Sequence, residues 1–436
     1  MSAFSILFIV AVLSLLIRSQ KVLKGAVLVG LLLAAYAAFI KVPLELNGFA
    51  TGSAVTLFEI VLMVVVASVV LSEDENINIT QTLFLATASV ALLQSRTLLT
   101  FVISFEALSI ISFVLVANIK SRDAAVGAVK MFVSGSIATA LILLGTTLYL
   151  FEGHGLDAPL QEVGSFAQVG LWVMLMGIFY KLTIVPMHSW AADSYAQVRP
   201  SHAAVLSGVV KSVAVVAVFE TFMPFLLQES SLNTPILITL ALVTMTLGNF
   251  MALFQKRVGK ILSYSSIAHA GYMLLGFAAV KSSYAPTAIL YVAVAYIFMQ
   301  TALFMLLDKI AKGASTMTLE GLKGLAARDK RVAILFSVQL FSLAGIPLLA
   351  GFLSKAVLVY AVVDIELPFV ALAVLLNSAL SVAYYAWIVK HIYFDAPVGE
   401  QAPISLSNTA FIAQVLLLAG TLYFGMFAAT LFDVTL

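Results

Sequence analysis

The feature that most constrains this chain is a succession of apolar stretches, each long enough to cross a lipid bilayer. A spanning helix needs about 20 predominantly apolar residues, and on that basis the 436 residues predict fourteen spanning helices. Their approximate extents are 2–17, 22–40, 50–71, 79–94, 97–117, 124–151, 168–198, 201–227, 234–254, 258–279, 285–311, 331–363, 367–393 and 407–432. Because the loops are short, we expect one all-α integral membrane domain over residues 1–436.

The composition supports this class and excludes others. Hydrophobic residues make up 62% of the chain and charged residues 10%, whereas soluble domains carry roughly 25% charged residues. The formal net charge of +2, without any long basic block, gives no sign of nucleic-acid binding. The absence of cysteine excludes disulfides, iron–sulfur ligation and Cys-ligated zinc.

The distribution of lysine and arginine predicts the topology, because cytoplasmic loops of membrane proteins are enriched in both. With the N-terminus outside, sixteen basic residues fall on the inner side and three (Lys41, Arg96 and Lys281) on the outer side. Four lysines inside helices complete the 23 basic residues. An error of one helix would scramble this asymmetry, so we expect both termini on the outer, periplasmic side of a bacterial inner membrane.

Two of the predicted helices, the seventh and the twelfth, are interrupted by proline and glycine. The interruptions lie in KLTIVPMHSW and SLAGIPLLAGFLSK, around Pro186 and Pro347. Broken helices at corresponding places point to inverted repeats with a site between them. We therefore expect an N-terminal three-helix segment (1–78), two inverted five-helix repeats (79–228 and 234–394) and a last helix (407–432).

Several ionisable residues lie at membrane depth, where each costs roughly 3 kcal/mol or more and is by default a functional hypothesis. Glu106 has no charged neighbour for nine residues on either side, and Lys181 precedes the first break by one turn. Lys211 lies near the middle of the eighth helix and Lys355 two turns beyond the second break. Lysine suits a proton relay because its ammonium can lose its proton when buried, whereas arginine stays charged.

For other polar residues a purely structural role explains the pattern as well as a functional role does. His269 follows Tyr264 and three serines, and a string of imidazole and hydroxyl groups can pass protons, but a hydrogen-bonded core histidine fits equally well. Lys130 could lie at the membrane–water interface. His188 and His202 flank the first break and could have no role beyond capping it. Neither histidine has the spacing of a zinc site, so no metal site is expected. Glu59 and Glu220 are interpreted as structural.

The stretches FEALSIISFVL, YKLTIVPMHSW with PSHAAVLSGVVK, KILSYSSIAHAGYMLLG and LFSLAGIPLLAGFLSK resemble the antiporter-like subunits of respiratory complex I. Mrp-type cation/proton antiporters and membrane-bound hydrogenases share this family. Within it the chain is most similar to the N-type subunit, because it ends after its fourteenth helix and has Lys355 where M-type subunits have glutamate. PSHAAVLSGVV and the altered SWAAD depart from the N-type pattern.

The resemblance implies a proton-translocating subunit of NADH:quinone oxidoreductase in which Glu106 and Lys181 form a switching ion pair. Lys211 would carry the proton, His269 would connect the relay, and Lys355 would gate exchange with the outer side. NADH, FMN, iron–sulfur clusters and quinone would all belong to partner subunits, and none to this chain. The expected neighbours are K-like and M-like membrane-arm subunits and membrane lipids.

Three other functions remain open on the sequence. An Mrp-type cation/proton antiporter subunit would need oxygen ligands for sodium near the breaks, and the chain offers few deep acids. A membrane-arm subunit of an energy-converting hydrogenase would share the mechanism with a different electron donor. A scaffold bundle without any proton pathway would leave the four deep lysines without a role.

Overall fold

The computed structural model describes residues 1–40, 49, 52–117, 122–157, 160, 164–228, 233–397, 404, 406–428 and 430–432. Lys41 and Lys120, two basic residues of the topology prediction, lie outside this described part. Within it the regular structure is helical, with two isolated antiparallel bridges, Phe49 with Ser95 and Arg257 with Thr318.

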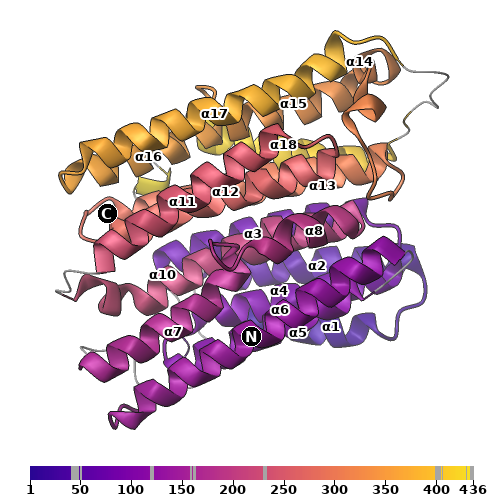
Figure 1. Cartoon of the computed structure of the whole chain (residues 1–436). Coiled ribbons are helices and arrows are strands. Elements are labelled where there is room, and N and C mark those ends of the chain that lie inside the picture. Colours follow the sequence, from indigo (N-terminus) through magenta and orange to yellow (C-terminus); the bar gives the residue numbers. More distant parts are fainter. Residues whose placement is uncertain are drawn as a thin grey trace.

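In chain order the helices are α1 (Ala3–Ser14), α2 (Gln20–Phe39), α3 (Ser53–Ser72), α4 (Asn76–Gln94), α5 (Leu98–Val116), α6 (Arg122–Phe151), α7 (Ser165–Leu182), α8 (Ser189–Gln197), α9 (Pro200–Ala203), the π-helical η1 (Ala204–Val210), α10 (Lys211–Leu227), α11 (Asn233–Leu253), α12 (Val258–Ala278), α13 (Ala285–Ile310), the 3₁₀ turn η2 (Leu319–Leu322), α14 (Leu325–Arg328), α15 (Lys330–Ala344), α16 (Ala350–Asp364), α17 (Pro368–Tyr393) and α18 (Asn408–Met426). The long helices lie side by side in one bundle, with the N-terminal half in the lower part of the view and α15 to α17 at the top (Figure 1).

Eleven of the described helices are long and apolar enough to cross a membrane, against the fourteen spans predicted. The three predicted spans outside this set are the first, the tenth and the twelfth. The first, α1, has only 12 residues, and the tenth, α12, is less apolar because it carries serines and His269. The twelfth is divided into α15 and α16, of 15 residues each. The chain is therefore an all-α, multi-pass membrane protein.

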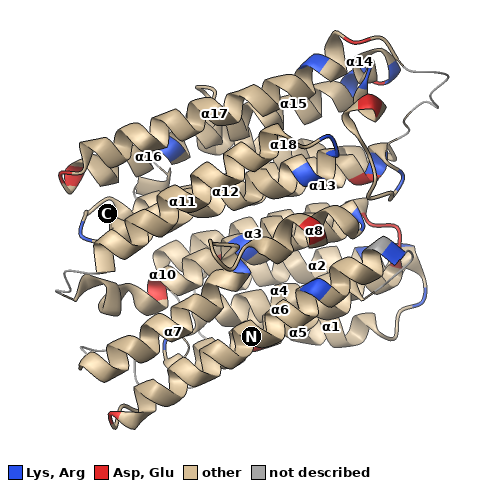
Figure 2. Cartoon of the chain, in the orientation of Figure 1, with Lys and Arg blue, Asp and Glu red and all other residues tan. Residues whose placement is uncertain are grey.

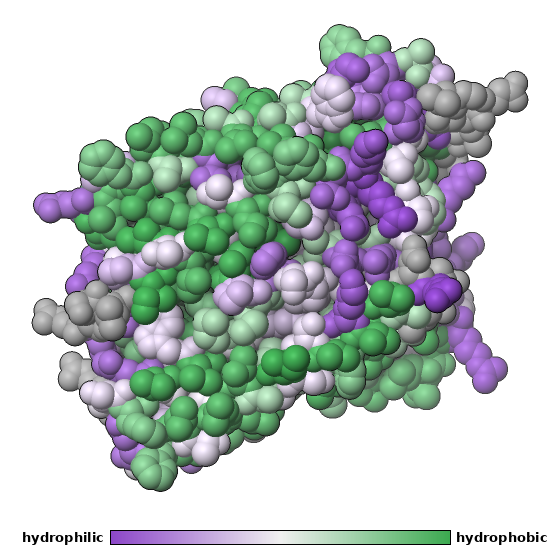
Figure 3. Space-filling model, in the orientation of Figure 1, coloured by the Kyte–Doolittle hydropathy of each residue, from purple (hydrophilic) through white to green (hydrophobic). Residues whose placement is uncertain are grey.

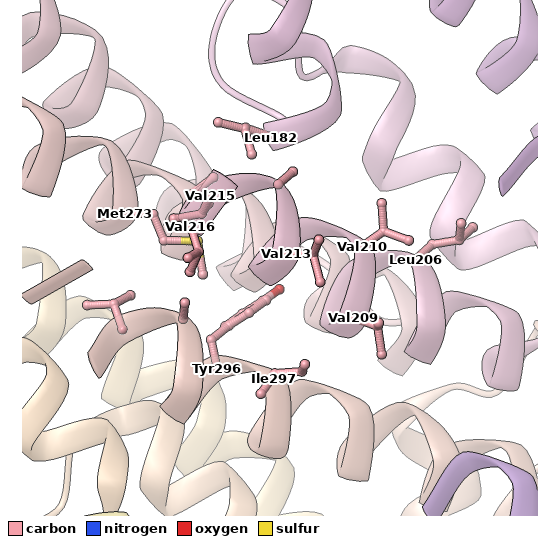
Figure 4. Packing of buried hydrophobic residues seen from close by; sticks show 14 of the residues in the cluster. Leu182, Leu206, Val209, Val210, Val213, Val215, Val216, Met273, Tyr296 and Ile297 are labelled. Carbon is pink, nitrogen blue, oxygen red and sulfur yellow. The ribbon is translucent and has the colours of Figure 1, made fainter. Parts of the chain in front are cut away.

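Two long stretches form the centre of the bundle: residues 200–227 and α13, whose apolar windows are both fully buried. A helix that is apolar on all sides is expected in the interior. Figure 4 shows Val209, Val213 and Val216 of the first stretch facing Tyr296 and Ile297 of α13. The middle of the first stretch, where Lys211 lies, is thus packed against α13 by apolar side chains.

Both predicted interruptions are present, and they end their first halves in the same way. Helix α7 is followed by the left-handed capping residue Thr183, with φ +61°, and α15 by the left-handed capping residue Gly345, with φ +91°. In each case the N–H of the next isoleucine donates to a carbonyl five residues earlier, Ile184 to Phe179 at 2.9 Å and Ile346 to Phe341 at 3.0 Å. This is the Schellman arrangement of a helix C-terminus.

The eighth predicted helix contains a feature that the sequence did not predict, the π-helical segment η1. It begins four residues after Pro200 and ends directly before Lys211. At Gly208 a β-carbon would lie 2.3 Å from the hydroxyl of Thr301 on α13, so only glycine allows this approach. π-Helical turns inside α-helices occur frequently at functional sites.

The surface agrees with a membrane setting. Most charged residues lie at the ends of the helices, with a concentration of lysine and arginine at the end that carries α14 (Figure 2). Between the ends the visible face is largely hydrophobic (Figure 3). Over the whole described surface, large apolar side chains such as Leu32, Phe132 and Leu375 are exposed. Such an apolar belt matches the hydrocarbon core of a bilayer.

Candidate functional site

Lys211 is fully buried at the point where η1 passes into α10. Its ammonium donates to the Thr183 hydroxyl at 2.7 Å, to the Ser266 carbonyl at 3.0 Å and to the Ser266 hydroxyl at 2.5 Å. Thr183 is the residue that ends α7 at the first break, and Ser266 lies on α12. Lys211 therefore joins the broken helix to the neighbouring half of the bundle.

Lys355 occupies a comparable place beside the second break. It is 8% exposed, and its ammonium donates to the carbonyls of Leu343 at 2.9 Å and Ala344 at 3.1 Å, the last two residues of α15. A third hydrogen bond of 2.9 Å reaches the hydroxyl of Ser378 on α17. Carbonyls at a helix C-terminus lack intrahelical partners and carry partial negative charge, so they suit a cation.

His269 lies on α12 between the two lysines and is 4% exposed. Its Nδ1 is 2.9 Å from the Ser265 carbonyl, and its ring lies against the rings of Tyr272 and Tyr296. The ammonium of Lys355 is 5.3 Å from the centre of the Tyr272 ring. Polar side chains of α12 thus extend from the Lys211 contact at Ser266 towards Lys355.

Lys181 and Glu106 are close in the fold but do not form the predicted ion pair. Among the described residues Lys181 donates to two hydroxyls of α5, Ser109 and Ser112, at 3.3 Å each. Glu106 accepts a 2.9 Å hydrogen bond from Thr139 on α6, and its second carboxyl oxygen is buried with no partner in the described ranges. The two serines follow Glu106 by three and six residues on α5. The hydrogen bonds of the Lys181 ammonium therefore go to these hydroxyls and not to the Glu106 carboxylate.

Lys130 lies at a different kind of position from the other three lysines of the predicted relay. Its side chain is 47% exposed and forms an ion pair of 2.5 Å with Asp193 on α8. Asp193 also pairs with Lys260 of α12 at 3.2 Å. This half-exposed cluster connects α6, the second half of the broken helix, and α12.

The remaining candidates are not brought into the Lys211–Lys355 region as direct partners. His188 lies in the first break at half-burial, and its Nδ1 has no hydrogen-bond partner in the described part of the chain. His202 is buried in α9, and Tyr264 is half-buried on α12. Within the described residues no group of three or more His, Cys, Asp or Glu side chains could hold a metal ion.

The sequence did not single out the hydroxyl groups that accept hydrogen bonds from the buried lysines. Thr183, Ser266 and Ser378 each accept from a buried ammonium, yet serine and threonine are common in membrane helices, where they usually bond to their own backbone. Ser266 had been noted only as part of the run before His269. The one available signal for Thr183 was its place next to the break.

The chemistry of the site follows from the partners of the two central lysines. In the described structure neither Lys211 nor Lys355 has a carboxylate within ion-pair distance, and every acceptor is a neutral hydroxyl or carbonyl. A charged ammonium without a counter-ion is costly to bury. Such a group can bind and release a proton when the charge of its surroundings changes.

Comparisons with known proteins agree on one family. The family model described as NADH:quinone oxidoreductase/Mrp antiporter, transmembrane, matches residues 95–381. The NADH-quinone oxidoreductase subunit N 2 of Solidesulfovibrio magneticus is 35% identical over 288 residues, which are 64% of this chain and 61% of that protein. The subunit N of Rubrobacter xylanophilus is 32% identical over 362 residues, 79% of this chain and 74% of that protein.

Solved structures share the fold over nearly the whole chain. A chain of respiratory complex I from Thermus thermophilus has a TM-score of 0.88 at 24% identity, with 99% of both chains covered. A chain of the Mrp complex from Dietzia has a TM-score of 0.89 at 18% identity, covering 99% of this chain and 94% of that one. At these identities the likeness concerns the fold alone.

Proposed function

The chain belongs to the NADH:quinone oxidoreductase/Mrp antiporter transmembrane family, and from this membership we propose that it is an N-type membrane-arm subunit that translocates protons. Electron transfer from NADH to quinone, in other subunits of the complex, would drive it. Its similarity to two N subunits over most of its length supports this assignment.

The observation that carries the proposal is the row of buried polar groups between the two helix breaks. It begins with Thr183 at the first break, continues through Lys211 and Ser266 to His269, and ends with Lys355 at the second break. Isolated charges at this depth destabilise a helix bundle, so their presence points to a function that requires them. Two lysines held only by neutral acceptors are suited to gain and lose protons.

The matched breaks also support the repeat architecture. In this proposal the chain crosses the membrane fourteen times, with both termini outside, and residues 79–228 and 234–394 form inverted five-helix repeats. The seventh and twelfth helices are the discontinuous ones, α7–α8 and α15–α16. The shared Schellman ends at Thr183 and Gly345 are what two copies of one unit would have.

Glu106 and Lys181 act in this proposal through their field and not through a direct contact. Glu106 lies three residues from Ser109, which binds Lys181. A proton gained or lost by Glu106 changes the potential at Lys181 and then at Lys211, because charges interact strongly where water is excluded. The Lys211 proton passes by way of His269 towards Lys355, which exchanges it with the outer side.

The remaining parts of the machinery belong to partners. We propose K-like and M-like subunits as neighbours and membrane lipids around the apolar belt, in a bacterial inner membrane. NADH, FMN, the iron–sulfur clusters and quinone would be bound by other subunits. This chain supplies the proton path, consistent with a sequence that contains no cysteine.

Replacing Lys211 with methionine tests the function directly. In inverted membrane vesicles that contain the assembled complex, Lys211→Met should abolish proton uptake while NADH oxidation continues. Lys281→Met is the matched control, because Lys281 is an exposed lysine in the loop before α13. Full pumping by Lys211→Met would contradict the proposal, and equal loss in both variants would point to failed assembly.

A second candidate is a subunit of an Mrp-type cation/proton antiporter, which the TM-score of 0.89 to the Dietzia Mrp complex favours as a fold. It predicts sodium-dependent pH changes in vesicles without any redox substrate. The redox-driven proposal predicts no such change, so the same vesicles separate the two functions.

A further inference from the structure

A buried carboxyl group outside the lysine row, Glu59 of α3, has surroundings that the proposed path does not explain. Its side chain is fully buried, and one oxygen accepts a hydrogen bond of 2.7 Å from the Gln94 amide at the end of α4. Among the described residues the other carboxyl oxygen has no hydrogen-bond partner, and neither has the amide oxygen of Gln94. One turn before Glu59, the buried hydroxyl of Thr56 also has no partner in the part of the chain that the structure describes.

No cation compensates this carboxyl group within ion-pair distance in the described part of the chain. Arg96 is the charged residue whose field reaches it, but its guanidinium is paired with Glu220 at 3.0 Å. The helices packed against α3 are α2, α4, α13 and α18, with a smaller contact from η1. Their charged residues, Lys21, Lys24, Asp308 and Lys309, lie at the opposite end of the bundle, near Leu71 and Asp74.

A proton on Glu59 accounts for the unpaired atoms. An ionised carboxylate accepts hydrogen bonds only, whereas a protonated carboxyl group also donates one. Burying the neutral acid is far less unfavourable than burying an uncompensated carboxylate. The neutral acid also brings a donor to a place where the Gln94 oxygen and the Thr56 hydroxyl are available as acceptors.

The position of Glu59 connects it to the end of the bundle that the topology places outside. Glu59 is the seventh residue of α3, roughly 9 Å along the axis from its first residue. Gln94 is the last residue of α4, and Arg96 and Glu220 beyond it are 28% and 32% exposed in their side chains. Glu220 lies on α10, the helix that begins with Lys211.

We propose that Glu59 is a proton-binding site that exchanges protons between the first half of the bundle and the outer medium, at the end of the bundle where Gln94 and the Arg96–Glu220 pair lie. The step breaks the O–H bond of the Glu59 carboxyl group and delivers that proton to water at the outer surface. The Gln94 N–H remains to stabilise the carboxylate left behind. This role rests on the proposed translocation function, whereas the protonation of Glu59 does not.

Infrared difference spectra of the assembled complex on exchange into D₂O test the protonation. Glu59→Gln should remove one carbonyl band of a protonated carboxyl group, and Gln94→Leu should shift that band to higher frequency by removing its hydrogen bond. Glu220→Gln is the spectroscopic control and should leave the band in place, because Glu220 is ion-paired. A spectrum unchanged by Glu59→Gln would overturn the proposal.

The exchange role is tested by the proton yield per NADH oxidised, with Glu59→Gln expected to lower the yield while NADH oxidation continues. If the band disappears but the yield stays unchanged, Glu59 only clamps α3 to α4 and the exchange role is overturned. Failure of the translocation function has a different signature. In that case Lys211→Met would pump normally, while Glu59→Gln would still remove its infrared band.

Discussion

At the scale of single residues, the groups around each buried lysine decide whether its ammonium can release a proton. The sequence placed four lysines inside helices, and three of them, Lys181, Lys211 and Lys355, are buried in the structure, whereas Lys130 is 47% exposed. Their acceptors were not predictable. Ser109 and Ser112 also donate to backbone carbonyls four residues earlier, so nothing in their local pattern reveals that their oxygens additionally receive Lys181. Among the described residues the hydrogen-bond partners of Lys181 are therefore Ser109 and Ser112, and the switching role of Glu106 and Lys181 stays a prediction.

Thr183 provides the first prediction at this scale. A β-branched residue at φ +61° is strained, by about 1 kcal/mol or more relative to glycine, and its hydroxyl is one of three acceptors of Lys211. Thr183→Gly should keep or slightly raise the melting temperature of the complex while lowering proton yield. Thr183→Ser, which retains the hydroxyl, should pump normally. Normal pumping by Thr183→Gly would show that this hydrogen bond is dispensable.

At the scale of elements, the two breaks were predictable because proline and glycine interrupt otherwise apolar helices. The π-helical segment before Lys211 was not, since AVLSGVV has no composition that distinguishes it from an α-helical turn. Within this segment Gly208 lies against Thr301 of α13, a tertiary contact that a local sequence pattern cannot show. The structure therefore adds a local geometry at Lys211 that the periodicity of the sequence does not encode.

Gly345 gives the prediction for the second break. Its φ of +91° disfavours any side chain, and an added β-carbon would lie 3.3 Å from Cδ of Lys355. Gly345→Ala should destabilise the subunit by about 1 kcal/mol or more and reduce coupling by displacing Lys355. The matched control is Gly25→Ala in α2, where the added carbon meets nothing within 4 Å and alanine is the better helix former.

Thermal unfolding of the two glycine variants in the assembled complex measures the difference. We expect a lower midpoint for Gly345→Ala and an unchanged or slightly higher midpoint for Gly25→Ala. Equal midpoints would mean that the left-handed end of α15 is not required.

At the scale of the whole molecule, the sequence predicted an all-α membrane bundle and its resemblance to N-type complex I subunits, and the family match and the relatives confirm that resemblance. The contacts that hold distant segments together were not predictable, because they depend on how loop charges meet after folding. One such contact is centred on Arg199. Its guanidinium binds Asp308 through two hydrogen bonds, of 3.0 and 3.1 Å, and lies 3.3 Å from both Glu73 and Glu75.

This cluster joins the end of α3, the start of α9 and the end of α13. Burial on its own would lower the pKa of the Arg199 guanidinium. Its hydrogen bonds to Asp308 and the nearby carboxylates of Glu73 and Glu75 outweigh burial and raise that pKa above its usual value. Arg199→Met should destabilise the subunit by about 3–5 kcal/mol, because Asp308 would be left buried without its partner. Arg331→Met is the control, since the Arg331 side chain is 68% exposed and its 3.6 Å pair with Asp329 contributes little.

The yield of assembled complex and its melting temperature report this effect. If Arg199→Met and Arg331→Met assemble equally well, the cluster does not hold the three segments together.

The central claim, that Lys211 and Lys355 act in series on one proton path, is tested most directly by the number of protons translocated per NADH oxidised. The measurement compares Lys211→Met, Lys355→Met and the double variant in proteoliposomes. In a series relay either substitution blocks the whole path, so the account predicts that the double variant loses no more than each single variant. Partial, additive losses, with the double variant pumping less than either single one, would contradict it.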